Sequence, residues 1–407
     1  MEISQIMIGR RAFIGVGALA LGTAVASQRF DYASSLVRIA RTSTESRWYP
    51  WTISLDRSLR TAFDRWSPAT AAAGPNVHLL DLSDIENFSQ LRLVRRQRLI
   101  ERTQGWELSA ENPASRNDVG YPSLVWGGAD GDKSQYHLFY AIHDPDSGIG
   151  LARASDIYGP YTKFRGQSIE RDSRVIFAPA RPRATSHLSS PVVLWNAQRK
   201  LWHMYFHYYS NQFDDGFGHQ NTALATSRNL VDWDVLTGHD GDFLAVLPVT
   251  PELWMNSQST YHTVQRLPNG LWLAFLRGTG IRKTGSTMEE QPTAMGLAAS
   301  LDGIRWSLVP GAPQWPALPQ QVEGRVIQRP GFVARMRGGF ALVWAHQPQR
   351  GPEKRFAAFT RDFAEFRQME LPDWGMSIED GAISAVRKGQ EVVMITGPYA
   401  YGFAIDR

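Results

Sequence analysis

The 407-residue sequence contains no cysteine. Disulfide bonds, thiolate metal sites and cysteine nucleophiles are therefore excluded, and cysteine usage says nothing about the compartment. A large excess of charge of one sign is also lacking, because the net charge is only +4 and Lys and Arg are scattered along the chain. We expect no nucleic-acid partner, since phosphate binding needs a concentrated basic surface. Aromatic residues are abundant instead, with 14 Trp, 13 Tyr and 19 Phe, and these suit both β-rich cores and stacking on sugar rings.

Long hydrophobic runs are lacking except near the N-terminus, where Arg10 and Arg11 precede an apolar run over residues 15–25. The run ends in Ala-Val-Ala, and the whole pattern predicts a secretory signal over residues 1–26. The arginine pair resembles a twin-arginine signal, so we expect a periplasmic or extracellular protein. The run is short for a membrane span, so we expect none once the signal is removed.

The rest of the chain divides into two parts. Residues 27–80 are interpreted as an extension and linker, with apolar residues at helical spacing before a run of Ala, Gly and Pro. Residues 81–407 are interpreted as one all-β domain, because they repeat a single pattern five times.

Each repeat has an apolar first strand, a polar turn, an aromatic-rich second strand, a third strand with small residues and a fourth strand that opens with an aromatic residue. The first strands are predicted at residues 122–126, 191–195, 260–264, 331–335 and 382–386. The second strands are predicted at 136–142, 202–208, 271–277, 340–346 and 392–397, and the third at 149–153, 222–226, 295–299, 356–360 and 401–405. The fourth strands open at Tyr161, Trp233, Trp306 and Phe366. The pattern predicts a five-bladed β-propeller, with a β-sandwich as the alternative.

The fifth repeat has no fourth strand of its own, because the sequence stops at Arg407. Residues 88–94, near the start of the domain, are predicted to supply it. A ring closed by strands from both ends of the chain leaves no exposed sheet edge at the junction.

Several stretches resemble family 43 and related five-bladed glycoside hydrolases. Residues 149–161, 221–233 and 297–306 resemble the blade ends of these enzymes, and residues 187–195 resemble the second blade of bacterial members. The resemblance covers most of residues 115–407 and implies a carbohydrate bound where the first strands begin, at the propeller axis. It leaves the sugar open, because a fold alone does not fix function. It also implies no cofactor other than a loosely bound calcium ion on the axis. The histidines are not spaced as zinc ligands are.

Glycoside cleavage needs two carboxyl groups, one on each side of the bond. Asp118 is the first candidate, although the resemblance would place the base where Tyr121 stands, directly before Pro122. Asp118 therefore either reaches the axis from its loop or caps a turn. Asp380, with Glu379 beside it, precedes the fifth repeat. We interpret it as a residue that catalyses the reaction or binds the substrate; the alternative is a solvent-exposed turn.

Glu323 is the candidate general acid, because Glu323-Gly-Arg325 resembles the Glu-Gly-Pro of family 43. Arg325 replaces the proline, and a neighbouring Arg lowers the pKa of a carboxyl group, contrary to what a general acid needs. Either the Arg325 side chain points away from Glu323, or Glu323 binds substrate hydroxyl groups through hydrogen bonds instead of acting as the acid.

Further residues at the starts of the repeats are predicted to bind substrate. His187 and Ser189 offer hydrogen bonds, Trp254 a stacking surface and Asn256 a ligand for a hydroxyl group. The alternatives are a hydrogen bond to a loop carbonyl for His187 and a place in the core for Trp254. With Tyr121, Arg325 and Glu379 they complete the predicted binding set.

The sequence therefore predicts an exported glycoside hydrolase that uses carboxylate acid–base catalysis. A phosphorolytic relative is an alternative, with Arg325 and Arg329 holding phosphate. The rival of another class is a non-catalytic propeller that binds an envelope or secreted polysaccharide.

Overall fold

The computed structural model describes residues 79–108, 119–127, 135–142, 148–166, 172–177, 184–210, 219–237, 243–247, 255–267, 270–284, 287–290, 293–308, 326–348, 354–361, 366–376 and 383–406. The predicted signal and nearly all of the predicted extension lie outside these residues. Within them, no helix is long and apolar enough to cross a membrane.

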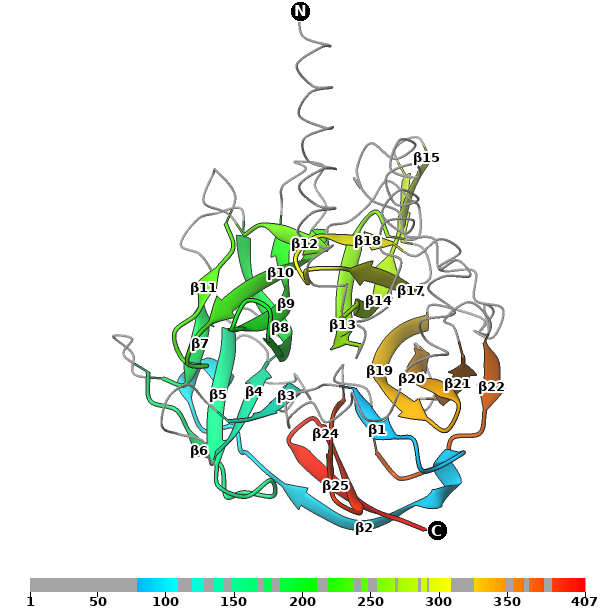
Figure 1. Ribbon diagram of the computed structural model, residues 1–407. Coiled ribbons are helices and arrows are strands. Elements are labelled where there is room, and N and C mark those ends of the chain that lie inside the picture. Colours follow the sequence, from blue (N-terminus) through cyan, green and yellow to red (C-terminus); the bar gives the residue numbers. More distant parts are fainter. Residues whose placement is uncertain are drawn as a thin grey trace, which may run out of the picture.

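Five antiparallel blades surround a central axis, as Figure 1 shows, so the predicted all-β five-bladed propeller is confirmed and the β-sandwich is not. Blade 1 contains β3 (Gly120–Trp126), β4 (Tyr136–Ala141), β5 (Gly148–Ala154) and β6 (Thr162–Lys163), with β7 (Arg174–Phe177) also on β5. Blade 2 contains β8 (Ala184–Asn196), β9 (Leu201–Ser210) and β10 (His219–Ser227), with β11 (Asp234–Val235) and β12 (Ala245–Leu247) on β10.

The remaining blades follow the same order from the axis outwards. Blade 3 contains β13 (Gln258–Arg266), β14 (Trp272–Thr279), β17 (Ala294–Ser300) and β18 (Trp306–Leu308), and the hairpin β15 (Ile281–Thr284) and β16 (Thr287–Glu290) projects from it. Blade 4 contains β19 (Val326–Met336), β20 (Gly339–Pro348), β21 (Lys354–Thr360) and β22 (Arg367–Met369). Blade 5 contains β23 (Ser384–Lys388), β24 (Glu391–Thr396) and β25 (Tyr399–Ile405).

The ring is closed by a strand from the start of the domain, as predicted. β2 (Leu91–Arg98) pairs antiparallel with β25, with Leu93 opposite Phe403. The strand begins later than expected, because Asn87 caps a short 3-10 helix over Phe88–Gln90. The sequence did not indicate β1 (Leu80–Leu82), which pairs parallel with β19 on the axial side of blade 4.

Small residues in the third strands allow neighbouring blades to pack closely. Ala223, Ala225, Ala298 and Ala299 are fully buried. One interblade core joins Leu273 and Leu297 to residues of blade 4, including Leu342 and Trp344. Burial of this apolar surface stabilises the ring by roughly 25 cal/mol for each Å² removed from water.

Candidate functional site

The first strands of the blades share an irregularity near their beginnings. The pairing of β3, β8 and β13 with their second strands shifts register at Tyr121, Ser190 and Tyr261, and β19 has the same shift at Gly331. The three non-glycine residues have positive φ angles of 53°, 54° and 43°. Such a backbone costs a non-glycine residue about 1–3 kcal/mol, and strain of this kind concentrates at functional sites. The bulges therefore mark the axial ends of three blades as the region to inspect.

Side chains from the first three blades meet at this end of the axis. The ring of Tyr261 lies 6.0 Å from that of Tyr121 and 4.8 Å from that of His207, measured between centroids. His187 lies beside His207, with 3.0 Å between their Nε2 atoms. Tyr121, Tyr261 and His207 are almost fully buried, whereas His187 is half-buried. We call these four residues the axial ring cluster.

Two guanidinium groups extend the axial ring cluster towards blades 3 and 4. Arg277 lies with Cζ 3.9 Å from the centroid of the Tyr261 ring, and its Nη2 donates to Gln258 Oε1 at 2.8 Å. The Cζ of Arg329 lies 5.4 Å from the same centroid. A cation over an aromatic face is held by the ring quadrupole. The described part of the site is therefore aromatic and cationic, with partners suited to sugar rings, hydroxyl groups and anions.

Ser189 and Ser190 add buried hydroxyl groups beside the axial ring cluster. Their side chains are almost fully inaccessible, and among the described residues no group lies within hydrogen-bond distance of either Oγ. Buried hydroxyl groups ordinarily have a hydrogen-bond partner. Both can donate to, or accept from, a hydroxyl group that enters the site.

Asn256 has a structural partner. Its Nδ2 donates to the carbonyl of Ile281 at 2.9 Å, and its Oδ1 accepts from the Ile281 N–H at 2.6 Å. This pairing fixes the start of the hairpin β15–β16. These two hydrogen bonds give the Asn256 side chain a structural role. A role for Asn256 in substrate binding stays a prediction.

The predicted acid and base groups, and three of the predicted binding residues, lie outside the described residues. This applies to Asp118, Trp254, Glu323, Arg325, Glu379 and Asp380. The structure does bring Tyr121, His187 and Ser189 together, since all three lie on β3 or β8 near the bulges.

Three residues of the described site were not predicted as site residues: His207, Tyr261 and Arg277. His207 and Arg277 lie on second strands. The sequence predicted these strands only as aromatic-rich strands inside the blades. Tyr261 lies inside the predicted first strand at 260–264, whereas Tyr121 and Ser190 directly precede theirs, so only the bulges of the structure align the three residues.

The centre of the ring is nearly filled. A cavity of about 20 Å³ remains, lined by inner strands of all five blades, and its polar residues are Ser123, Thr263 and Ser384. Ser123 Oγ accepts from Val193 N–H and Ser384 Oγ from Leu124 N–H, both at 2.9 Å, which links blade 1 to blades 2 and 5.

This cavity does not fit a calcium ion. Calcium takes six to eight oxygen ligands and usually several carboxylates, and the described lining offers hydroxyl groups and no carboxylate. The volume is that of about one water molecule. Elsewhere in the described ranges, no group of three or more His, Asp or Glu side chains is arranged to hold a metal.

Comparisons with known proteins agree with the fold. No family model and no curated protein matches the chain. Among solved structures, the chain is similar to a thermostable family-43 glycoside hydrolase, with 11% identity, a TM-score of 0.48, and coverage of 70% of this chain and 88% of that one. It is also similar to a glycosyl hydrolase from Bacteroides ovatus, with 13% identity, a TM-score of 0.46 and coverage of 77% and 94%.

A third similar structure comes from work on the GH130 family of mannoside phosphorylases, which contains hydrolases of β-1,2-mannosidic linkages in Candida mannan. The identity is 14%, the TM-score is 0.48, and 78% of this chain and 97% of that one are covered. The predicted resemblance to glycoside hydrolases is thus found among solved structures. At these identities and TM-scores it carries no conclusion about activity, and the five-bladed fold rests on the sheets themselves.

Proposed function

We propose that this protein is a glycoside hydrolase whose active site lies where β3, β8 and β13 begin. The observation that carries the proposal is the convergence of the axial ring cluster from three blades, at bulges with positive φ angles. Strained backbone and buried polar groups at one end of a propeller axis are expected of a binding site rather than of a core.

Each described group has a role in this proposal. Tyr121 and Tyr261 are almost fully buried and pack behind the site, and Ser189 and Ser190 provide buried hydroxyl groups. His187 is half-buried and therefore able to contact a substrate, while His207 holds it from behind. Arg277, stacked on Tyr261, binds a hydroxyl group or an anionic substituent of the sugar.

The acid and base are proposed to be two of the three predicted carboxylates. Asp118, Glu323 and Asp380 precede β3, β19 and β23 in the chain by two, three and four residues. Because an extended chain spans at most about 3.6 Å per residue, these separations along the chain are compatible with catalytic groups at the starts of the first strands. One would protonate the leaving oxygen, and the other would activate water or attack the sugar.

Phosphorolysis is the second candidate, because two guanidinium groups approach Tyr261. Arg329, on β19, was predicted to hold phosphate, and the structure gives it Arg277 as a neighbour on the same ring. Two arginines are well suited to bind a phosphate group through paired N–H donors. In this reaction phosphate replaces water as the nucleophile.

The test is release of sugar from a panel of aryl glycosides and bacterial polysaccharides, with and without phosphate. Asp118→Asn, Glu323→Gln and Asp380→Asn are compared with wild type, and Glu86→Gln, at an exposed residue paired with Arg337, serves as control. We expect two of the three changes to abolish release and the control to retain it. Release that requires phosphate and yields sugar phosphate would favour phosphorolysis. Polysaccharide binding without release from any substrate would favour the non-catalytic propeller.

We also propose that residues 1–26 direct export through the twin-arginine route. The proposal is supported by Arg10 and Arg11 before the apolar run and by the Ala-x-Ala ending. Arg10→Lys together with Arg11→Lys should retain the protein in the cytoplasm. Fractionation of cells that express the two forms tests this, and unchanged export would contradict it.

A further inference from the structure

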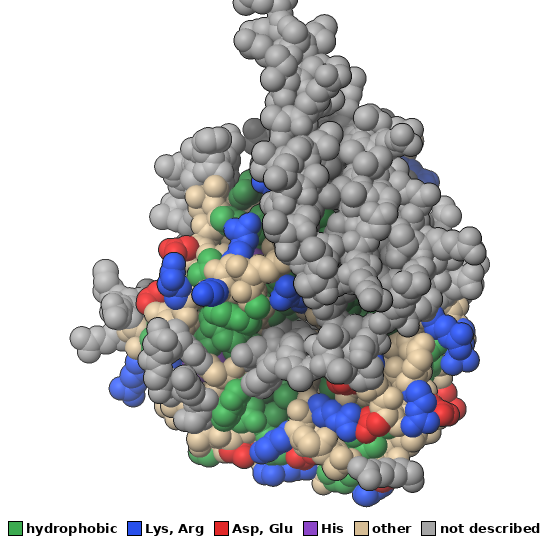
Figure 2. Space-filling model, in the orientation of Figure 1, with side chains coloured by type: hydrophobic (Ala, Val, Ile, Leu, Met, Phe, Trp, Pro, Cys, Tyr) green, Lys and Arg blue, Asp and Glu red, His purple; other side chains and the backbone are tan. Residues whose placement is uncertain are grey.

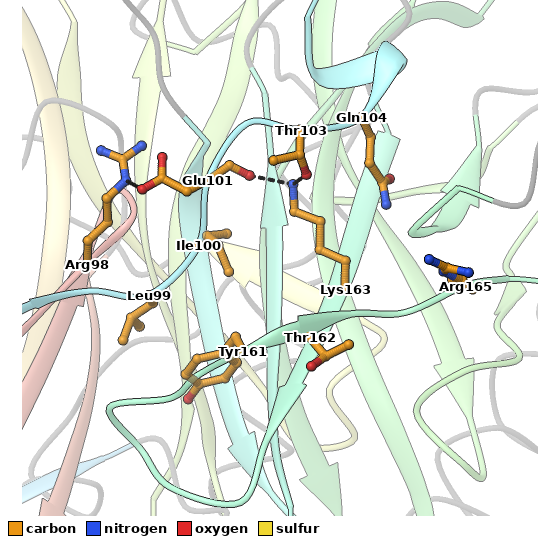
Figure 3. Close-up of a pocket in the computed structure, with 10 residues that line it drawn as sticks. All are labelled: Arg98, Leu99, Ile100, Glu101, Thr103, Gln104, Tyr161, Thr162, Lys163 and Arg165. Atoms are coloured by element: carbon orange, nitrogen blue, oxygen red, sulfur yellow. Dashed lines mark hydrogen bonds and ion pairs between the residues drawn. The ribbon is translucent and has the colours of Figure 1, made fainter.

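A second cavity lies at the rim of the propeller, away from the axis. Its volume is about 410 Å³, and it lies between the segment that follows β2 and the outermost strand of blade 1, β6 (Figure 3). Sites for small organic molecules usually have about 300–1,000 Å³. The rim cavity is therefore large enough for a sugar residue and much larger than an inorganic anion requires.

The lining of the rim cavity combines hydrogen-bonding groups with a small apolar surface. Thr103, Gln104 and Thr162 contribute hydroxyl and amide groups, and Leu99 and Tyr161 contribute apolar surface. Proteins bind sugars with this combination, since a sugar ring presents hydroxyl groups at its edge and C–H groups on its faces.

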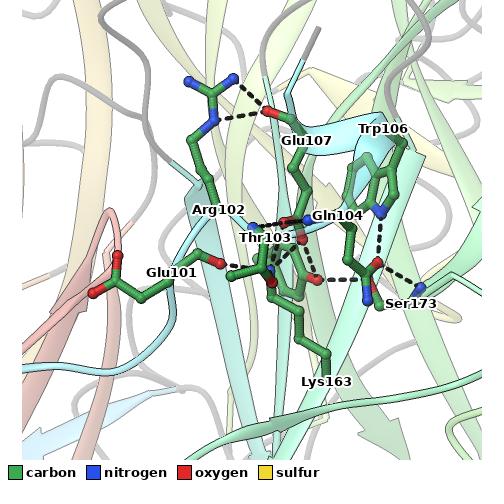
Figure 4. Close-up of polar contacts among 9 residues, drawn as sticks. Glu101, Arg102, Thr103, Gln104, Trp106, Glu107, Lys163 and Ser173 are labelled. Carbon is green, nitrogen blue, oxygen red and sulfur yellow. Dashed lines mark hydrogen bonds and ion pairs between the residues drawn. The ribbon is translucent and has the colours of Figure 1, made fainter.

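One wall of the rim cavity is held by a buried carboxylate. Glu107 is fully buried, and its oxygens accept from the N–H groups of Thr103 and Gln104 at 2.8 and 2.9 Å and from Tyr140 Oη at 2.8 Å. Lys163 Nζ forms an ion pair with the same carboxylate (Figure 4). The wall is thus fixed before any ligand arrives, which lowers the entropic cost of binding.

The rim cavity carries more positive than negative charge. Lys163 is neutralised by Glu107, and Arg98 is paired with Glu101 at 2.7 Å. Arg165 is exposed at the opening, and within the described part of the chain it forms no ion pair.

The positive charge continues from the rim cavity along β2. Arg96 lies with Cζ 4.3 Å from the ring centroid of Tyr399, and Arg98 lies 5.4 Å from the same centroid. Figure 2 shows Lys and Arg side chains along the lower rim, with Asp and Glu side chains between them, where β2 runs in Figure 1. Stacking on the aromatic ring holds each guanidinium group in place on the surface of β2.

We propose that the rim cavity binds a uronic acid residue of an acidic polysaccharide, separately from the axial site. Arg165 contacts the carboxylate, Thr103 and Thr162 contact ring hydroxyl groups, and the neighbouring chain follows Arg96 along β2. The choice of a saccharide rests on the proposed function, whereas the cavity and its charge do not. The site would hold a polymer on the enzyme while the axial site acts on another part of it.

The experiment is titration calorimetry of the full chain with trigalacturonate, its carboxyl-reduced neutral analogue and inorganic sulfate. Arg165→Gln removes the charge, and Thr162→Trp fills the opening without changing charge. Both positions are exposed, so neither substitution should affect folding. Arg228→Gln, an exposed arginine on blade 2, is the matched control.

We expect trigalacturonate to bind and the neutral analogue to bind about tenfold more weakly, as for loss of one charged hydrogen bond. Arg165→Gln and Thr162→Trp should each weaken binding about as much, and Arg228→Gln should not. Equal binding of the neutral analogue, equal displacement by sulfate, or full binding by Thr162→Trp would each overturn the proposal.

Sugar release from the best aryl glycoside is measured on the same variants. Release without trigalacturonate binding would reject the rim site and leave the proposed hydrolase standing. Trigalacturonate binding that depends on Arg165, without release, would reject the hydrolase and leave the rim site standing.

Discussion

His187 and His207 face each other across β8 and β9, with their Nε2 atoms 3.0 Å apart. A hydrogen bond at this distance needs one ring nitrogen to donate and the other to accept, so both rings cannot be imidazolium while the bond lasts. The pair can therefore take up or release one proton without moving, next to the ring of Tyr261.

Replacement of His187 by Phe should lower kcat/KM for sugar release by about 10- to 100-fold, equivalent to 1.4–2.7 kcal/mol of transition-state stabilisation. The ring size is retained while the donor and acceptor are lost, and His187 is only half-buried, so the fold should persist. Kinetics and thermal melts of the two proteins provide the check. An unchanged kcat/KM would show that His187 does not contact the substrate.

Acid should destabilise the protein through two buried histidines. Burial lowers the pKa of His203 and of His262 to about 4, from the ordinary value of 6.5. Between these pH values the unfolded chain binds more protons than the native state. The contribution of these histidines to the free energy of unfolding is therefore complete above about pH 6.5. It falls as the pH drops towards 4, by up to about 1.4 kcal/mol per pH unit for each histidine.

Urea unfolding between pH 4.5 and 8 measures this loss. His262→Gln should reduce the slope on the acid side, because glutamine does not titrate, even if the variant is less stable at neutral pH. An identical slope in wild type and variant would rule out His262 as a source of the pH dependence.

Removal of the carboxylate at Glu107 should be far more damaging than removal of one at the surface. Glu107→Gln leaves the ammonium group of Lys163, whose side chain is only 12% exposed, without its counter-charge. Breaking a buried ion pair in this way costs about 3–5 kcal/mol. The matched change Glu86→Gln breaks a pair with Arg337 in which both side chains are more than half exposed, and it should cost under about 1 kcal/mol. Chemical denaturation compares the two, and similar losses would contradict the structural role of Glu107.

Gly150 should not tolerate a side chain. A Cβ atom at this position would lie 2.5 Å from Cζ of Tyr140 and 2.9 Å from Cζ2 of Trp106, two rings that are buried and stacked. Gly150→Ala should therefore destabilise the protein by about 1–3 kcal/mol through overpacking. Gly105→Ala is the control, because a Cβ there would meet no atom within 4 Å. Equal thermal stability of the two variants would show that the interface between the rings can open.

Much of the fold was predictable because the signals are local. The turns, the aromatic second strands and the small third strands recur in each repeat, and the strands at Tyr136–Ala141 and Trp272–Thr279 fall where the sequence predicts them. Closure by β2 was also predictable, since the fifth repeat lacks a fourth strand that the start of the domain can supply. β1 was not, because three residues paired in parallel with β19 have no periodicity to detect.

The candidate site was only partly predictable. The start of each repeat directed attention to Tyr121, His187 and Ser189, and the structure brings these together near the bulges. His207 and Arg277 could not be singled out, because on a second strand their direction depends on the neighbouring blades. The candidate carboxylates Asp118, Glu323 and Asp380 remain predictions from the sequence.

The sequence by itself determined the number of blades, the order of their strands and the way the ring closes, because hydrophobic alternation and turn residues act within about 70 residues of chain. The tertiary structure decided which side chains share a space. Tyr261 contacts Tyr121, His207 and Arg329 from three other blades, and Lys163 reaches Glu107 from a segment 56 residues away. Such contacts depend on how whole blades are placed around the axis, and no local pattern of residues encodes that placement.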